Sequence, residues 1–218
     1  MVDVADEATL REQLVEQYIH VERIGLNELA SGNLSVRFGD NMLISPSGAT
    51  ADNIAPDTIV ECSLEGEWKG DRKPSSEWRM HAAIYQKNEK TLAVVHTHSD
   101  YCVAMASNLK PLPGFHYLVG SFGGTDVPCV PYSTFGTQSL GDDAAEALAD
   151  RSACLLGKHG MIARGRNIKS TVDLAHRLEI MCRQYVLACR VGEPEPLTDE
   201  EWAEFFDRAQ KVAYGKFI

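Results

Sequence analysis

Three histidines occur at a spacing that favours metal binding. His96 and His98 are separated by one residue at the end of the apolar run 92–95. Residues i and i+2 of a strand point to the same face, so these two imidazoles can bind one metal ion from one rigid element. His159 follows a second apolar run, 153–156, and could supply a third nitrogen ligand.

Glu77 adds an oxygen to these candidate ligands, because it stands at the expected start of a helix directly after Ser75 and Ser76. Three histidines with one displaceable group is the composition of a catalytic zinc site, which keeps a position open for substrate. Spacing alone leaves a second interpretation open, in which His96 and His98 simply face solvent.

The remaining histidines have no such context, and for these we expect a surface role or a satisfied place in the core: His20, His81, His116 and His176. A small anion such as phosphate has its own candidate site. Free amides and the dipole at a helix start favour anions, which suits Ser75 and Ser76. Asn33, Ser47 and Gly48 lie in predicted turns that could complete such a cradle, although each residue is equally suited to a turn or cap alone.

The elements that must position these residues mix helices and strands without a strict βαβ rhythm. Apolar periodicity predicts helices over residues 6–29, 77–86, 100–107, 139–149, 168–190 and 199–213. Alternating or short apolar runs predict strands over residues 33–37, 41–45, 58–64, 91–96, 127–131, 153–156 and 161–164. This pattern indicates one α/β domain over residues 1–218, with a mixed sheet covered by helices.

Composition narrows the classes of function. A net charge of -10 argues against general nucleic-acid binding, which needs a basic surface. We expect no membrane span, because no apolar run approaches about 20 residues. The acidic N-terminal segment does not resemble a signal peptide, and the six scattered cysteines are expected to be reduced and buried, so we expect a cytoplasmic protein.

Five short motifs, in this order, resemble those of the class II aldolase and adducin family, and most closely its L-fuculose-1-phosphate aldolase branch. They are Ser31-Gly32-Asn33-Leu34-Ser35, Ser45-Pro46-Ser47-Gly48, Ser75-Ser76-Glu77-Trp78-Arg79-Met80-His81, Val94-Val95-His96-Thr97-His98 and Lys158-His159-Gly160. The similarity begins at about residue 7, includes residues 131–137 and extends to Tyr214-Gly215.

The resemblance implies a three-layer α/β/α fold with a mixed, largely antiparallel central sheet. It also implies a homotetramer of C4 symmetry whose active sites are shared between subunits. The residues matching His96, His98 and His159 would bind Zn²⁺, with Mn²⁺ or Co²⁺ as possible substitutes.

The resemblance further assigns roles to individual residues. Glu77 would ligate the metal in the empty site and then act as base. Tyr117 would donate a proton from the neighbouring subunit, and Tyr214 would close over the site. The family places its phosphate site on the residues matching Asn33, Ser47, Gly48, Ser75 and Ser76.

The implied activity is that of a zinc-dependent class II aldolase, which reversibly cleaves a ketose 1-phosphate to dihydroxyacetone phosphate and an aldehyde. One residue departs from the branch. Lys158 precedes His159 where two adjacent histidines are usual, which puts the aldehyde half in doubt. We therefore expect 5-deoxyribulose 1-phosphate or 5-methylthioribulose 1-phosphate as substrates beside L-fuculose 1-phosphate.

Three alternatives remain open on this scaffold. A pentulose-phosphate 4-epimerase would break and remake the carbon–carbon bond without releasing dihydroxyacetone phosphate. A methylthioribulose-1-phosphate dehydratase would act on a related substrate. A non-catalytic, adducin-like binding module would lack the metal, and the retained Glu77, His96, His98 and His159 speak against it.

Overall fold

Seven strands form one sheet in the order β3-β2-β1-β4-β7-β6-β5 in this computed structural model, which describes residues 6–212. Every neighbouring pair is antiparallel except β5 and β6. The strands are β1 (Asn33–Phe38), β2 (Asn41–Ile44), β3 (Val60–Ser63), β4 (Ala93–Thr97), β5 (Cys129–Val130), β6 (Ala153–Leu156) and β7 (Gly160–Gly165). The expected mixed, largely antiparallel sheet is thus confirmed.

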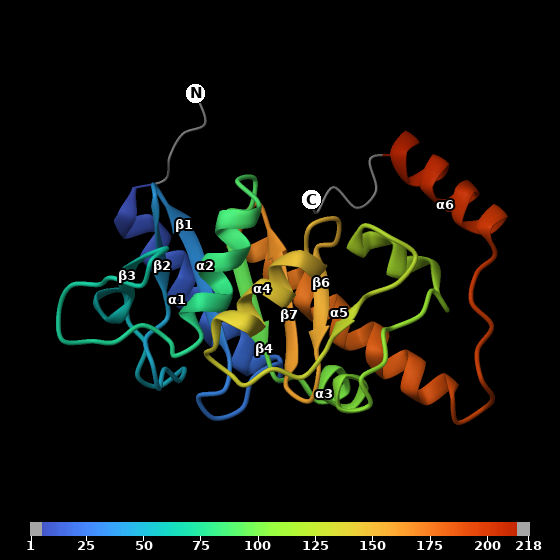
Figure 1. Ribbon diagram of the computed structural model, residues 1–218, viewed down its shortest axis with the longest axis horizontal. Helices are drawn as coiled ribbons and strands as arrows, with labels where there is room; N and C mark the ends of the chain where they lie inside the picture. The colour runs from blue at the N-terminus through green and yellow to red at the C-terminus, as the bar shows by residue number, and fades with distance from the viewer. Residues whose placement is uncertain (1–5, 213–218) are drawn as a thin grey trace.

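Helices cover both faces of the sheet (Figure 1). They are α1 (Glu7–Arg23), α2 (Trp78–Lys87), α3 (Asp100–Ser107), α4 (Gln138–Ala147), α5 (Ile168–Ala188) and α6 (Asp199–Lys211), with short 3-10 helices η1 (Pro56–Thr58) and η2 (Tyr117–Phe122). α2 and α4 pack together over one face, and α1, α3 and α5 cover the other, which gives the three layers. Within the described residues, no helix is both long and apolar enough to cross a membrane.

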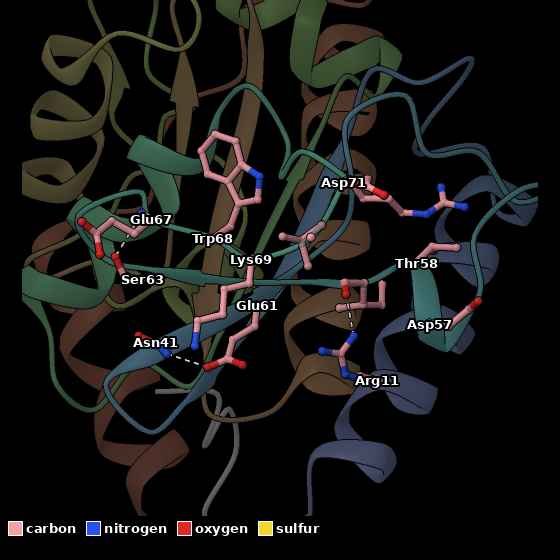
Figure 2. A pocket seen from close by; sticks show the side chains of 14 residues that line it. Arg11, Asn41, Asp57, Thr58, Glu61, Ser63, Glu67, Trp68, Lys69 and Asp71 are labelled. Carbon is pink, nitrogen blue, oxygen red and sulfur yellow. Dashed lines mark hydrogen bonds between the residues drawn. The ribbon is translucent and has the colours of Figure 1, made fainter.

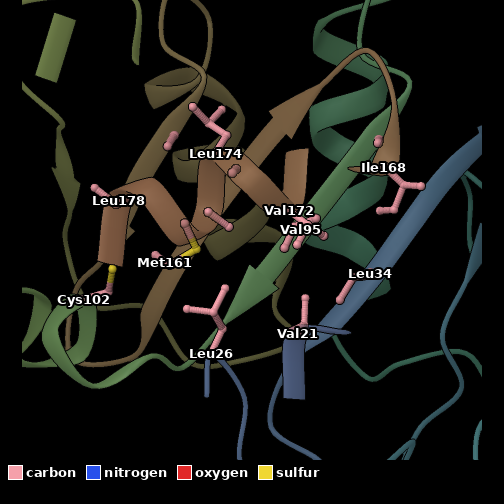
Figure 3. Close-up of a cluster of buried hydrophobic side chains, with 14 of the residues drawn as sticks. Val21, Leu26, Leu34, Val95, Cys102, Met161, Ile168, Val172, Leu174 and Leu178 are labelled. Carbon is pink, nitrogen blue, oxygen red and sulfur yellow. The ribbon is translucent and has the colours of Figure 1, made fainter. Parts of the chain in front are cut away.

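Alternation along the strands divides the core between the two faces. Leu34 of β1 and Val95 of β4 belong to the larger cluster, where they meet Val172 and Leu178 of α5 (Figure 3). Val94, the neighbour of Val95, instead joins the cluster beneath α2 and α4. Because successive side chains of a strand point to opposite faces, β4 is buried on both sides and forms a rigid support in the middle of the sheet.

Strand register brings the candidate ligands to one end of the sheet. His96 of β4 lies opposite Asn33 of β1 on one side and opposite Ile162 of β7 on the other. The loop that carries His159 connects β6 to β7 at this same end, because Gly160 begins β7 and Met161 pairs with Thr97.

Most predicted elements exist, and the differences have local causes. α1 ends at Arg23 and not near residue 29, because Gly25 adopts a left-handed backbone with φ of 74°. The strand expected over 127–131 is reduced to β5, since Val127 forms an isolated bridge to Leu112. β3 begins at Val60 because the chain before it forms η1.

The cysteines are all free thiols, as expected. Four of them are buried: Cys62, Cys102, Cys154 and Cys182. The expectation of burial is wrong for Cys189, which is exposed because it lies at the C-cap of α5, beyond the core.

Candidate metal centre

The fold brings the four predicted ligands into one cluster. One ligand atom from each of Glu77, His96, His98 and His159 lies within 4.8 Å of every other. His96 is in β4 and His98 follows directly after it, whereas His159 comes from the loop between β6 and β7. Glu77 occupies the N-cap position of α2, where its side chain makes no capping bond. Residues from three separate segments therefore converge on one point.

His96 is oriented by the backbone of the neighbouring strand. Its Nδ1 lies 2.8 Å from the carbonyl oxygen of Met161, and a carbonyl only accepts, so Nδ1 carries the proton and donates. Nε2 therefore points into the cluster, 3.0 Å from Nε2 of His98 and 3.0 Å from Oε2 of Glu77. Such a backbone partner fixes the tautomer and ring orientation of metal-binding histidines.

The protonation states of His98 and His159 suit a metal site. Burial lowers the pKa of His98 to about 3 and that of His159 to about 4, so both rings are neutral at physiological pH. Burial alone would raise the pKa of Glu77, but the charge and hydrogen bond of His96, helped by His159 and Asn33, outweigh it and lower that pKa. For His96, burial opposes protonation, but Glu77 outweighs burial and raises the pKa of that ring.

The donor set fits a divalent cation. Oε1 of Glu77 is buried and has no hydrogen-bond donor among the described residues, although Nε2 of His159 lies 3.3 Å away. A buried carboxylate oxygen without a donor needs another partner. Three imidazole nitrogens and one carboxylate suit zinc and other first-row transition metals. The cluster can therefore hold one metal ion, as the spacing of the histidines predicted.

Gly160 provides a test of how tightly β7 and β4 position this cluster. A Cβ added at Gly160 would lie 2.4 Å from the carbonyl oxygen of Thr97 and 3.3 Å from Cδ2 of His98. Because backbone must shift to admit it, Gly160→Ala is expected to destabilise the fold by about 1–3 kcal/mol and to weaken metal binding. Thermal unfolding with and without added zinc measures both effects.

The matched control is Gly192→Ala, because a Cβ there meets nothing within 4 Å. It should leave the unfolding midpoint and the stabilisation by zinc close to those of the unmodified protein. Equal behaviour of the two variants would contradict the packing described at Gly160.

The phosphate candidates lie on two neighbouring loops. Pro46 and Pro74 form an isolated bridge, and the amide of Ser75 donates to the carbonyl of Ser45. Ser47, Gly48 and Ser76 are exposed beside this bridge. The amides of Ser47 and Ser75 already donate to backbone carbonyls, whereas those of Gly48 and Ser76 donate no hydrogen bond within residues 6–212.

Two details differ from the expected cradle. Neither Ser75 nor Ser76 is the N-cap of α2, because Glu77 occupies that position and the hydroxyl of Ser75 accepts from the Glu77 amide. The side chain of Asn33 is buried, and its Nδ2 donates to Oε2 of Glu77 at 3.0 Å. The amide has a second N–H that this bond does not use, so the role of Asn33 at a phosphate stays a prediction.

A pocket of about 340 Å³ opens beside the cluster. Its lining residues are Ser31, Ser76, Glu77, His98, Tyr132, Ser133, Phe135, Lys158 and His159. Tyr132 and Phe135 are 58% and 65% exposed, a large amount of aromatic surface for one rim. Sequence reasoning assigned neither aromatic a role, because an aromatic in a loop gives no signal until the pocket places it beside the ligands.

A second pocket has a larger volume, but it is a weaker candidate for the functional site. It has a volume of about 940 Å³ and lies between α1, β3 and the loop after β3 (Figure 2). Its lining has charges of both signs: Arg11 forms an ion pair with Glu7, and Glu61 accepts a hydrogen bond from the amide of Asn41. No group of metal-binding or nucleophilic side chains converges there among the described residues, so the smaller pocket is the candidate site.

The two tyrosines are placed differently. Tyr117 begins η2, is 47% exposed, stacks on His116 and lies against Phe205 of α6. It does not line the pocket formed by its own chain. Tyr214 lies outside the described residues.

Comparison with known proteins adds a separate line of support. The family described as Class II Aldolase and Adducin N-terminal domain matches residues 12–186. The 5-methylthioribulose-1-phosphate/5-deoxyribulose-1-phosphate aldolase of Rhodospirillum rubrum is 43% identical over 199 residues, covering 91% of this chain and 90% of the relative. The L-fuculose phosphate aldolase of Escherichia coli K12 is 38% identical over 200 residues, covering 91% and 93%.

A solved structure is similar as well. An L-fuculose 1-phosphate aldolase superposes with a TM-score of 0.87 at 33% identity, covering 93% of this chain and 96% of that chain. The similarity in sequence and in structure thus extends over nearly the whole length, including every element that carries a candidate ligand.

Proposed function

This chain belongs to the class II aldolase and adducin family, and we propose from this premise that it reversibly cleaves a ketose 1-phosphate to dihydroxyacetone phosphate and an aldehyde, using Zn²⁺ held by His96, His98 and His159. The observation that carries the proposal is the convergence of these rings with Glu77 beside an open pocket. When bound, the ion supplies a Lewis acid that stabilises the negative charge left on the ketone fragment.

The residues of the chain would move the protons. Cleavage breaks the bond between C3 and C4, the electron pair stays on C3, and the C4 hydroxyl loses its proton as the aldehyde forms. Glu77 is an anion beside the cluster and suits the proton transfers at C3 of the ketone fragment: it would take a proton from C3 in aldol addition and return one to C3 after cleavage. The C4 hydroxyl needs a group that takes its proton in cleavage and gives it back to the aldehyde oxygen in the reverse reaction, a role that suits Tyr117 of a neighbouring subunit.

The loops beside Glu77 suit the phosphate group. The exposed Ser47 and Ser76 offer hydroxyls, and the amides of Gly48 and Ser76 are available to an anion. Ser76 also lines the pocket that contains His98 and His159, so a phosphate on this loop would lie one residue from the catalytic carboxylate. Ser75 contributes by holding the Glu77 amide.

The aromatic residues of the pocket suit an aldehyde half of low polarity. Tyr132 and Phe135 present aromatic surface there, and Lys158 takes the place beside His159 with a left-handed backbone, φ of 55°. We infer that 5-deoxyribulose 1-phosphate and 5-methylthioribulose 1-phosphate are substrates beside L-fuculose 1-phosphate, in line with the name of the Rhodospirillum rubrum relative. An equal kcat/KM for all three would remove this preference.

One assay separates the aldolase from its alternatives. Each ketose 1-phosphate is coupled to glycerol-phosphate dehydrogenase, so that only released dihydroxyacetone phosphate oxidises NADH. An epimerase or a dehydratase would consume substrate without this signal, and an adducin-like binding module would consume none. Failure of every ketose 1-phosphate in the panel to give the signal would overturn the proposal.

We also propose a cytoplasmic homotetramer, and the position of Tyr117 favours active sites that are shared between its subunits. Tyr117 is exposed and does not line its own pocket, so a neighbouring subunit must present it if it acts at the site. We predict that Tyr117→Phe and Glu77→Gln proteins, each impaired alone, regain activity when they are unfolded together and refolded. In a ring of four formed at random, about a quarter of sites combine an intact Glu77 with an intact neighbouring Tyr117.

The control is each variant refolded alone under the same conditions. Recovery near a quarter of the normal rate supports sharing between subunits. A mixture whose rate equals the mean of the two variants would show that each site is built from one chain.

A further inference from the structure

A buried chain of hydrogen bonds leads away from Glu77 into the layer between α2 and β1. Oε2 of Glu77 accepts from Nδ2 of Asn33 at 3.0 Å, and Oδ1 of Asn33 lies 2.6 Å from Nε2 of His81. Nδ1 of His81 lies 2.7 Å from the hydroxyl of Ser35, which lies 2.8 Å from the hydroxyl of Tyr85. All five residues are buried.

The helical spacing of α2 and the strand alternation of β1 bring these hydrogen-bonding groups together. Glu77, His81 and Tyr85 are spaced four residues apart along α2, so they share one face of the helix. Asn33 and Ser35 are alternate residues of β1, so they point to the same side of the sheet. When these faces of α2 and β1 pack together, the polar side chains of the helix alternate with those of the strand. Leu34, which lies between Asn33 and Ser35 in the sequence, points into the core on the other side of the sheet.

Donors and acceptors fix the direction of the chain. An ionised Glu77 only accepts, so Asn33 must turn its NH₂ toward Glu77 and its carbonyl toward His81. Nε2 of His81 then carries the proton and donates, which leaves Nδ1 to accept from Ser35. The Ser35 oxygen in turn accepts from Tyr85. Burial lowers the pKa of His81 to about 3, in keeping with a neutral ring that has one donor and one acceptor.

We propose that His81 is a positioning residue: its Nε2–H holds the Asn33 amide in the orientation that presents an N–H to Glu77, and so places the Glu77 carboxylate at the metal centre. The proposal rests on the function proposed above for Glu77. Without the His81 donor, the Asn33 carbonyl loses its partner, and only the Glu77 carboxylate still selects this orientation of the amide. Both side chains are buried, where an unpaired polar group is costly and the amide is held less firmly.

Two substitutions at one position separate this role from mere packing. In His81→Gln, the side-chain amide can reach the position of Nε2 and still donate to Asn33, but it loses Ser35. In His81→Asn, the shorter amide reaches the position of Nδ1 and keeps Ser35, but it loses Asn33. Each variant thus breaks one of two buried hydrogen bonds, so a purely structural role predicts equal damage from both.

The readouts are zinc affinity, by competition with a chelator of known affinity, and kcat and KM for a cleaved ketose 1-phosphate. Loss of a residue that orients a metal ligand typically costs about 10–100-fold in metal affinity or activity. We expect His81→Asn to show this loss in zinc affinity and in kcat, with KM changed less. His81→Gln should retain at least about tenfold more zinc affinity than His81→Asn, at a similar thermal midpoint. Equal zinc affinities, or the reverse order, would overturn the proposal.

Ser35→Ala keeps the test decisive if the His81 variants do not fold. It deletes the hydroxyl that donates to Nδ1, so one of the two hydrogen bonds that fix the tautomer and orientation of His81 is lost and its donor to Asn33 is held less firmly. Zinc affinity should fall, whereas Ser152→Ala, which deletes a buried hydroxyl that has no hydrogen-bond partner among the described residues, should leave it unchanged. Equal zinc affinity in these two variants would contradict the proposal. An unmodified protein that cleaves no ketose 1-phosphate would overturn the proposed function, and zinc affinity would still decide the role of His81.

Discussion

Glu77→Gln is expected to lower kcat by about 10²–10⁴-fold while the protein still folds and binds zinc. Glutamine has the shape of glutamate, and its carbonyl can still accept from Nδ2 of Asn33, so the buried packing is kept. What is lost is the anion that can take a proton beside the metal. Steady-state rates from the coupled assay, together with the zinc content of the purified variant, measure the effect.

The matched control is the same change at a surface carboxylate. Glu146 is exposed on α4 and pairs with Lys87 at 2.6 Å, and it does not line the candidate pocket. Glu146→Gln should leave kcat unchanged, because exposed ion pairs contribute about 0–1 kcal/mol to stability and nothing to the site. A Glu77→Gln protein that is as active as Glu146→Gln would contradict the role of Glu77 as base.

Removing the metal with a chelator is expected to lower the rate of cleavage by at least about 10³-fold, since the Lewis acid supplies several kcal/mol of stabilisation to the developing charge. The unfolding midpoint should fall as well, because Glu77, His96, His98 and His159 then face each other without a bridging cation. Circular dichroism before and after chelation checks that the sheet persists.

Adding zinc to the chelated protein should restore the rate, and manganese or cobalt should restore part of it. Addition of magnesium serves as the control, because Mg²⁺ prefers oxygen ligands and suits three imidazoles poorly. A rate that survives chelation, in a sample shown to hold no metal, would rule out this chemistry.

The candidate metal ligands could be proposed from the sequence because local patterns single out His96, His98 and Glu77, and the family resemblance joins His159 to them. Strand alternation puts His96 and His98 on one face. Glu77 lies at the start of a helix that the preceding Pro74, Ser75 and Ser76 predict. His81 could not be assigned in the same way. Its place depends on α2 packing against β1, two elements whose pairing no local pattern in the sequence specifies, and only that contact turns a satisfied core histidine into the support of Asn33.

The sheet order shows the same limit. The hairpin of β1 and β2 follows from a short turn at Gly39, but the pairing of β4 with β1 and β7 joins segments far apart in the chain. These non-local pairings create the site, because they bring His159 beside His96. The aromatic rim of Tyr132 and Phe135 likewise depends on where a loop lies after folding.

The most direct test of the account is a titration of the metal-free protein with zinc, in which the release of dihydroxyacetone phosphate is measured after each addition. If Glu77, His96, His98 and His159 form one catalytic site per chain, the rate should rise in proportion to added zinc and level off at one equivalent. The account would be contradicted by a rate that is independent of zinc, or by stoichiometric binding of zinc with no release of dihydroxyacetone phosphate from any ketose 1-phosphate.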